Sequence, residues 1–256
     1  LAKYAPKFLI RWMKKIIHQD ELNQILQYSN GAIDVEFANK VLQWLNVKSN
    51  VKFIDRESLN TNKRYIFVSN HPLGGLDGLT LISLFGKTFG KIKFVVNDIL
   101  MNVIPLRNIF VPVNKHGRMG RDYGQMIHDA YASDAQMLYF PAGLCSRLIK
   151  GKITDLEWKT NFIKQARKYD RDIVPIYFSG QNSKFFYRLA KIRKALGIKF
   201  NIEMIFLPDE MFRQKNSTFD VIIGKPIPIS SIDNTRNLQQ WCDEIRGKCY
   251  ELKPEE

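Results

Sequence analysis

A nine-residue loop between an apolar run and an amphipathic segment constrains the fold of this chain more than any other feature. The loop spans 69–77 and reads Ser-Asn-His-Pro-Leu-Gly-Gly-Leu-Asp. The apolar run 65–68 before it predicts a buried strand, and Leu81, Leu84 and Phe85 after it recur at helical spacing. The sequence therefore predicts a strand, a glycine-containing turn and a helix in succession, with Asp77 near the helix N-terminus.

A second turn of this kind follows another apolar run. Residues 137–139 predict a strand, and the turn 140–147 after them reads Phe-Pro-Ala-Gly-Leu-Cys-Ser-Arg. Ligands of α/β sheets bind beyond the carboxyl ends of the strands, so we expect both turns to face one crevice. A further strand, 172–178, ends in the polar turn 179–183. This turn is either a third wall of the site or the start of a helix capped by Asn182 or Ser183.

Apolar runs and amphipathic segments alternate along the rest of the chain. They predict helices at 4–17, 36–45, 122–132, 155–168, 184–196 and 237–252, and strands at 51–54, 93–96, 109–113, 200–207 and 219–223. No Ser/Gly/Pro-rich linker divides the 256 residues, and a hydrophobic content of 45% suffices for one sizeable core. The predicted fold class is α/β, a single domain with a mixed β-sheet flanked by helices. A helical segment, 1–48, is expected to precede the main unit, 49–256.

The segment 4–17 predicts a basic amphipathic helix. Phe8, Trp12 and Ile16 fall on one helical face, whereas Lys7 and Arg11 fall largely on the other. Such a helix suits lying in the plane of an anionic membrane. An ordinary domain helix with a solvated charged face gives the same pattern, and both interpretations remain open.

The charge of the chain favours an acidic partner. Its formal net charge is +14 and its pI is near 9.6, which suits anionic lipid, nucleic acid or an acidic carrier protein. No recognised nucleic-acid reader module is present, so we expect no nucleic-acid partner. The strongly basic helix at 184–196 is the preferred docking surface for an acidic carrier. The basic loop 115–121 is explained more simply by solvation than by phosphate contact.

Cysteine usage and hydropathy exclude several classes of protein. Cys145, Cys242 and Cys249 are odd in number and lack paired spacing, so neither a disulfide framework nor a metal site is supported. A reducing cytoplasm fits this pattern best. No run of 18 apolar residues exists, so no segment is expected to span a bilayer.

His71 and Asp77 have the chemistry of a general base and the group that orients it. An ionised carboxylate that accepts a hydrogen bond from one imidazole nitrogen leaves the other nitrogen as a base. The alternative is that His71 caps a loop and Asp77 caps a helix. Cys145 is a second candidate nucleophile, although a lone cysteine is more often a small buried hydrophobic residue.

In order and combination these motifs resemble the glycerolipid acyltransferase superfamily. The residues that carry the resemblance are Asn70-His71 with Asp77, Phe140-Pro141-Ala142-Gly143, and Val174-Pro175-Ile176, with a weaker match over 97–113. It spans residues 50–230 and implies a glycerol-3-phosphate acyltransferase-like fold. It also implies that 49–256 is an acyltransferase domain, which moves an acyl group from a thioester.

The chain departs from the family pattern at three positions. Five residues separate His71 from Asp77, where the family usually has four. Ala142 and Cys145 replace the glutamate and arginine that the family associates with a glycerol-phosphate acceptor, and Arg147 would substitute for the lost charge. This combination is more similar to the hemolysin-like, ornithine-lipid branch. That similarity implies acylation of an amino acid's amino group from a 3-hydroxyacyl carrier protein.

The combined expectation is a lipid-biosynthetic acyltransferase that uses a His-Asp pair. His71 and Asp77 are the expected catalytic residues, and the expected substrate-binding residues are Asn70, Gly74, Gly75, Phe140, Pro141, Gly143, Ser146 and Arg147. The donor would be acyl carrier protein or acyl-coenzyme A, with no further cofactor and no metal. The protein is expected on the cytoplasmic face of an anionic membrane, bound peripherally. The alternatives are 1-acylglycerol-3-phosphate O-acylation in phospholipid synthesis and a non-catalytic lipid-binding role.

Overall fold

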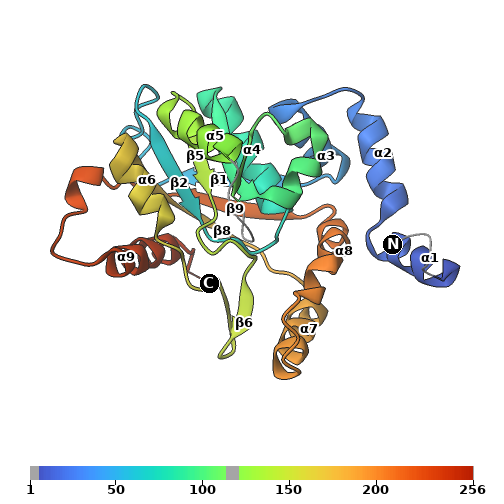
Figure 1. Cartoon of the computed structure of the whole chain (residues 1–256). Helices are drawn as coiled ribbons and strands as arrows, with labels where there is room; N and C mark the ends of the chain where they lie inside the picture. The colour runs from blue at the N-terminus through green and yellow to red at the C-terminus, as the bar shows by residue number, and fades with distance from the viewer. Residues whose placement is uncertain (1–5, 114–120, 256) are drawn as a thin grey trace.

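The fold is built around a twisted seven-stranded β-sheet, with helices on both of its faces (Figure 1). The computed structural model describes residues 6–113 and 121–255. The sheet strands are β1 (Lys48–Phe53), β2 (Tyr65–Ser69), β3 (Ile92–Asn97), β4 (Phe110–Val113), β5 (Gln136–Tyr139), β8 (Asp172–Phe178) and β9 (Thr218–Ile223). A separate hairpin is formed by β6 (Arg147–Ile149) and β7 (Lys152–Thr154).

Three of the described helices precede β1, and the others lie between or after the strands. The described helices are α1 (Lys7–Ile16), α2 (Gln19–Ser29), α3 (Asp34–Trp44), α4 (Leu76–Phe89), α5 (Arg121–Ala132), α6 (Asn161–Tyr169), α7 (Lys184–Ala195), α8 (Leu207–Arg213) and α9 (Leu238–Glu251). Short 3₁₀ helices occur at η1 (Asp98–Asn102), η2 (Ile104–Leu106), η3 (Ile202–Phe206) and η4 (Ile229–Ser231).

The sheet is mixed, as the sequence predicts. Its strand order is β1-β9-β8-β2-β5-β3-β4. Strands β8, β2, β5, β3 and β4 run parallel to one another, whereas β9 pairs antiparallel with β8 and parallel with β1. The carboxyl ends of the five parallel strands therefore lie together, and we call this side of the sheet the carboxyl edge.

Both faces of the sheet are buried at β2, which explains the unbroken apolar run in this strand. Tyr65 and Phe67 join a core with α3 and α4, whereas Ile66 and Val68 point the other way into a core with α5, α6 and α9. Side chains alternate between the faces of a strand, so a strand covered on both sides must be apolar at every position.

The structure corrects two expectations about secondary structure and adds two elements that were not predicted. Residues 200–207 are not a strand but lead through η3 into α8, where Pro208 occupies the first turn and suits a helix start. The helix expected from 155 begins only at Asn161, because Asp155 and Trp158 turn their side chains into the core. Helix α2 and the β6–β7 hairpin carry too weak a pattern to be predicted. Most of the basic loop 115–121 lies outside the described residues.

Helix α1 has no buried residue, and its apolar side chains face outward, with Phe8 74% exposed. Its junction with α2 is fixed to α8 by His18, whose Nε2 lies 2.9 Å from Asp209 Oδ1 and whose ring stacks on Phe212. No described helix has the length and hydropathy needed to cross a bilayer. The separation of 1–48 from 49–256 stays a prediction.

Candidate active site

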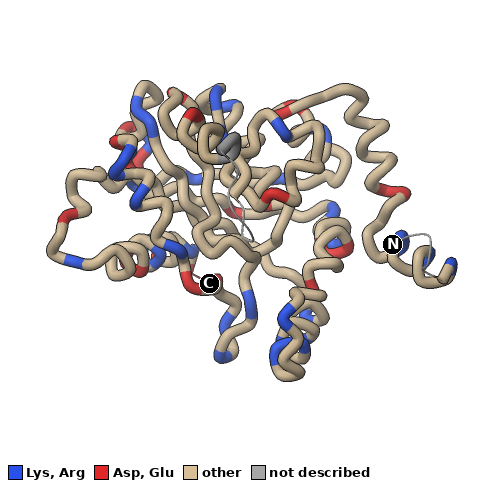
Figure 2. Tube along the Cα trace, in the orientation of Figure 1, with Lys and Arg blue, Asp and Glu red and all other residues tan. Residues whose placement is uncertain are grey.

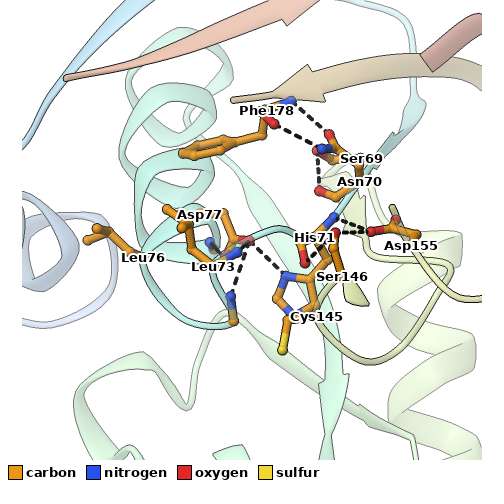
Figure 3. A network of polar contacts seen from close by, with 12 residues as sticks. Ser69, Asn70, His71, Leu73, Leu76, Asp77, Cys145, Ser146, Asp155 and Phe178 are labelled. Carbon is orange, nitrogen blue, oxygen red and sulfur yellow. Dashed lines mark hydrogen bonds and ion pairs between the residues drawn. The ribbon is translucent and has the colours of Figure 1, made fainter. Parts of the chain in front are cut away.

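His71 and Asp77 meet at the carboxyl edge, one from the loop after β2 and the other from the first turn of α4 (Figure 3). His71 Nδ1 lies 2.9 Å from Asp77 Oδ2. The Asp77 side chain is fully buried, whereas that of His71 is 12% exposed. The extra residue between them relative to the family pattern is accommodated within the loop, and the contact is not broken.

The loop backbone is folded around the Asp77 carboxylate. Oδ2 accepts a hydrogen bond from the Leu73 N–H and Oδ1 accepts one from the Gly78 N–H, each at 2.9 Å. Gly74 adopts a φ of +91°, and a Cβ at this position would lie 2.8 Å from Leu207 Cδ2. Only glycine fits both the left-handed backbone and this close approach, which gives a physical reason for the Gly in the motif.

Asp77 is held in its ionised form. Burial alone would raise the pKa of Asp77, but the adjacent His71 and the backbone N–H donors outweigh it and lower the pKa below its ordinary value. An ionised Asp77 accepts the Nδ1–H proton of His71 and so leaves Nε2 as the basic nitrogen. Within the described part of the chain, Nε2 has no hydrogen-bond partner.

The second turn supplies a wall for the imidazole. The Phe140 ring stacks on His71 with centroids 3.9 Å apart and planes inclined by 17°, and Phe94 packs behind Phe140. Gly143, at φ +64°, donates its N–H to the Phe140 carbonyl at 3.0 Å and closes the turn. The two turns therefore lie in contact. The crevice that both turns are expected to face stays a prediction.

Ser146 and Asp155 tie the second turn to the backbone of His71. The Ser146 N–H donates to the His71 carbonyl at 2.7 Å. Asp155 Oδ1 accepts from the His71 N–H at 3.2 Å and from the Ser146 hydroxyl at 2.5 Å, and its Oδ2 accepts from Trp158 Nε1 at 2.9 Å. Burial raises the pKa of Asp155. Sequence reasoning missed this carboxylate, because a single Asp without a motif at a characteristic spacing carries no signal.

We expect Asp155→Ala to lower the free energy of unfolding by about 2–4 kcal/mol, because three buried donors lose their acceptor. Urea denaturation of the two proteins measures the difference. Asp243, an exposed residue of α9, is the matched control, and Asp243→Ala should change stability by less than about 0.5 kcal/mol. Equal stability of the two variants would contradict the role given to Asp155.

Asn70, Pro141 and Arg147 lie in the framework of the site. Asn70 is buried, and its amide donates to the Phe178 carbonyl and accepts from the Phe178 N–H at 2.9 and 2.7 Å, so it joins the ends of β2 and β8. Pro141 is buried, and its carbonyl accepts from the Lys159 N–H. Arg147 is buried and its guanidinium contacts Glu203 at 2.9 Å. These positions favour structural roles over direct substrate contact.

The thiol of Cys145 is a poor candidate for a nucleophile. The residue is fully buried, packed against Phe186 and Tyr187. Burial raises the pKa of the Cys145 thiol to about 11, so the reactive thiolate is scarce at neutral pH. The geometry therefore favours direct attack by the acceptor over a covalent thioester intermediate on this residue.

The third turn is a helix start. Ser183 is the N-cap of α7, and its hydroxyl accepts a hydrogen bond from the Phe186 N–H. Neighbouring Asn182 is buried, and its side-chain amide has no hydrogen-bond partner among the described residues. The described residues also contain no group of three His, Cys, Asp or Glu side chains placed to hold a metal ion.

Comparisons with known proteins show the family of the chain. Residues 1–255 match a family described as "Acyltransferase". A lyso-glycine lipid O-acyltransferase from Bacteroides thetaiotaomicron is 47% identical over 251 residues, which cover 98% of this chain and 92% of that protein. A protein of the same name from Phocaeicola vulgatus is 45% identical over 251 residues, covering 98% and 89%.

The fold also has a counterpart among solved structures. The crystal structure of PlsC, a 1-acyl-sn-glycerophosphate acyltransferase from Thermotoga maritima, matches with a TM-score of 0.50 and 17% identity. The match covers 97% of this chain and 94% of that one. At this identity it shows a shared fold, and it confirms the architecture predicted from the sequence.

Proposed function

This chain belongs to the acyltransferase family and is a lipid acyltransferase, and we propose that it transfers a fatty acyl group from a thioester to a hydroxyl oxygen of a single-chain glycine lipid. The proposed acceptor is supported by 47% identity, over 98% of the chain, to a lyso-glycine lipid O-acyltransferase. The observation that carries the mechanism is the contact between His71 and the buried carboxylate of Asp77.

In the proposed reaction, His71 Nε2 takes the proton of the acceptor hydroxyl as its oxygen attacks the thioester carbonyl. The new C–O bond forms, the C–S bond breaks, and the proton on Nε2 passes to the departing thiolate. Asp77 keeps the Nδ1 proton in place and stabilises the transient imidazolium. Phe140 fixes the plane of the ring, so Nε2 faces the acceptor throughout the step.

The exposed backbone of the two turns would complete the site. Gly75 is exposed and carries no side chain that would obstruct a substrate, so its N–H is the proposed donor to the acyl carbonyl. Gly143 is exposed as well, but its N–H already donates to the Phe140 carbonyl, so its proposed role is to shape the second turn. Ser146 would act through the His71 backbone, to which it donates. The proposal assigns no substrate contact to Arg147, whose charge already faces Glu203.

Amino-acid N-acylation stays a prediction and is the second candidate. A hydroxyl acceptor is favoured because both relatives are named O-acyltransferases. The lysophosphatidate alternative has weaker support, since Ala142 and Cys145 stand where the family has its glutamate and arginine for a glycerol-phosphate acceptor.

Charge and exposure support a proposal for the donor and for the location. Acyl carrier protein, which is acidic, suits a chain with a net charge of +14, and acyl-coenzyme A is the alternative donor. No other cofactor is required by the proposed step. The exposed apolar face of α1 suits an anionic membrane surface, so a peripheral position on the cytoplasmic face of the membrane is part of the proposal.

Mass spectrometry of reaction products tests the acceptor. The protein would be incubated with acyl and 3-hydroxyacyl carrier proteins and with acyl-coenzyme A, against lyso-glycine lipid, free glycine, ornithine and lysophosphatidate. We expect an O-acylated glycine lipid as the main product. An N-acyl amino acid as the main product would replace the proposed acceptor by the second candidate, and product from lysophosphatidate alone would support the phospholipid alternative.

A further inference from the structure

Two basic segments project together from the carboxyl edge, and we infer that they form a second membrane-docking surface, which holds the site against an anionic bilayer. The segments are the hairpin 147–154 and the stretch 184–200, made of α7 and the turn after it, and we call them the basic tip. Figure 1 shows the hairpin beside α7 below the sheet. The inference rests on the proposed function only for the direction from which the acceptor arrives.

The positive charge of the basic tip is not balanced by acidic residues within its two segments. Neither segment contains an Asp or Glu. Figure 2 shows the Lys and Arg residues gathered on both projections. The exposed cations are Lys150, Lys152, Lys184, Arg188, Lys191, Lys194 and Lys199. Basic groups clustered in this way are attracted to the negative surface potential of an anionic leaflet.

Large apolar side chains are exposed among these cations. Ile192, Leu196 and Phe200 are 56%, 68% and 69% exposed, and Leu148 and Ile149 of the hairpin are exposed as well. An acidic carrier protein would account for the charges, and its binding is the competing outcome of the test below. A bilayer accounts for both the charges and the exposed apolar groups, because the cations meet headgroups while the apolar side chains enter the headgroup–acyl boundary.

The two projections are built as one unit. The carboxylate of Glu203, in η3, is fully buried and lies 2.9 Å from Arg147 of the hairpin and 2.9 Å from Arg193 of α7. The Arg147 guanidinium also stacks over Phe186 of α7. One buried carboxylate thus joins the hairpin, α7 and η3, which suits a surface that must present its groups together.

The position of the tip explains how a lipid acceptor would reach His71. The hairpin begins at the residue after Ser146, and Ser146 donates to the His71 carbonyl. Docking of the tip would therefore place the bilayer surface next to the catalytic loop. A single-chain lipid would then reach Nε2 by rising from the leaflet, without crossing water as a free monomer.

Vesicle co-sedimentation of the full chain tests the inference without requiring activity. We expect the wild-type protein to bind vesicles of phosphatidylglycerol and phosphatidylethanolamine and to bind phosphatidylcholine vesicles weakly. The double variant Leu196→Asp/Phe200→Asp should bind the anionic vesicles about tenfold or more weakly, since it places carboxylates where apolar groups enter the interface. Lys150→Glu/Lys152→Glu should weaken binding and reduce its dependence on salt.

Ile33→Asp is the matched control. Ile33 is 53% exposed, but it precedes α3 on the opposite side of the sheet, where neighbouring Asp34 contacts Asn108 just before β4. This variant should bind vesicles as the wild type does. Thermal denaturation of all variants establishes that the loss of binding is not a loss of fold.

Transfer to an acceptor dispersed in detergent separates this inference from the proposed function. The tip variants should retain wild-type turnover in detergent and lose it with acceptor in vesicles. Vesicle binding unchanged in both tip variants would overturn the inference, because α1 would then suffice. Loss of carrier-dependent turnover with intact vesicle binding would also overturn it and assign the tip to the carrier. Absence of turnover in any condition would refute the proposed function alone.

Discussion

Replacing His71 by alanine is expected to lower kcat/KM by about 10³-fold or more, because the acceptor hydroxyl would lose the group that takes its proton. The measurement is initial-rate transfer from acyl carrier protein to lyso-glycine lipid under identical conditions for both proteins. The side chain of His71 is partly exposed, and the backbone hydrogen bonds of His71 to Ser146 and Asp155 do not depend on the imidazole, so the substitution should leave the fold intact.

His128→Ala is the control for the first prediction. His128 lies on α5, is exposed, and among the described residues forms one hydrogen bond, with the Tyr169 hydroxyl at 2.7 Å. Its replacement should leave kcat/KM within about twofold of the wild type, because no reacting group is lost. Near-normal turnover by His71→Ala, with unchanged circular dichroism, would refute the proposed base.

Replacing Asp77 by asparagine is expected to lower kcat by about 10²–10³-fold with a smaller change in KM, because the effect falls on the imidazolium that forms during transfer. Asparagine has one acceptor oxygen, whereas both Asp77 oxygens accept hydrogen bonds from the loop backbone. The NH₂ group of asparagine would replace one of these acceptors by a donor. It would therefore lie against another donor, either a backbone N–H or the Nδ1–H of His71. Thr80→Val is the control, because it also removes a buried polar group from the first turns of α4. An equal loss in kcat in this variant would assign the effect of Asp77→Asn to packing.

The same substitution has a predicted signature in the dependence of stability on pH. The pKa of Asp77 is lower in the folded chain than in the unfolded chain, so the unfolded chain binds the extra proton as pH falls. The stabilisation that Asp77 provides is therefore fully present above its unfolded pKa of about 4, and is lost as pH falls through the lowered folded value. Thermal unfolding between pH 7 and pH 3 should show this loss in the wild type and not in Asp77→Asn.

The sequence predicted the parts of this molecule whose pattern is local. A strand buried on both faces must be apolar throughout, and the run 65–68 showed this directly. The His71–Asp77 contact was also accessible, since both residues lie within one loop. Their opposition to Phe140 followed from the rule that neighbouring strand ends meet at one edge of a sheet.

The remainder depended on contacts between distant residues. Residues 202–206 are apolar except for Glu203, which suggests a strand, but they form a 3₁₀ helix in which Glu203 makes buried ion pairs with Arg147 and Arg193. Asp155, which accepts a hydrogen bond from the His71 N–H, lies 84 positions away in the sequence. Arg147 was predicted to contact substrate because it would substitute for the charge lost at Cys145, and only the fold reveals the carboxylate of Glu203 that it already contacts.

The hydrogen bonds around Asp155 also extend into the last helix. The Asp155 N–H donates to the Tyr250 hydroxyl at 2.8 Å, and Arg246 donates to the Asp155 carbonyl at 3.0 Å. Helix α9 thus fixes the backbone of Asp155, whose carboxylate accepts a hydrogen bond from the His71 N–H. A tag or fusion partner joined after α9 should be separated from Tyr250 by a flexible spacer, because strain imposed on that helix is transmitted to the catalytic loop through two hydrogen bonds.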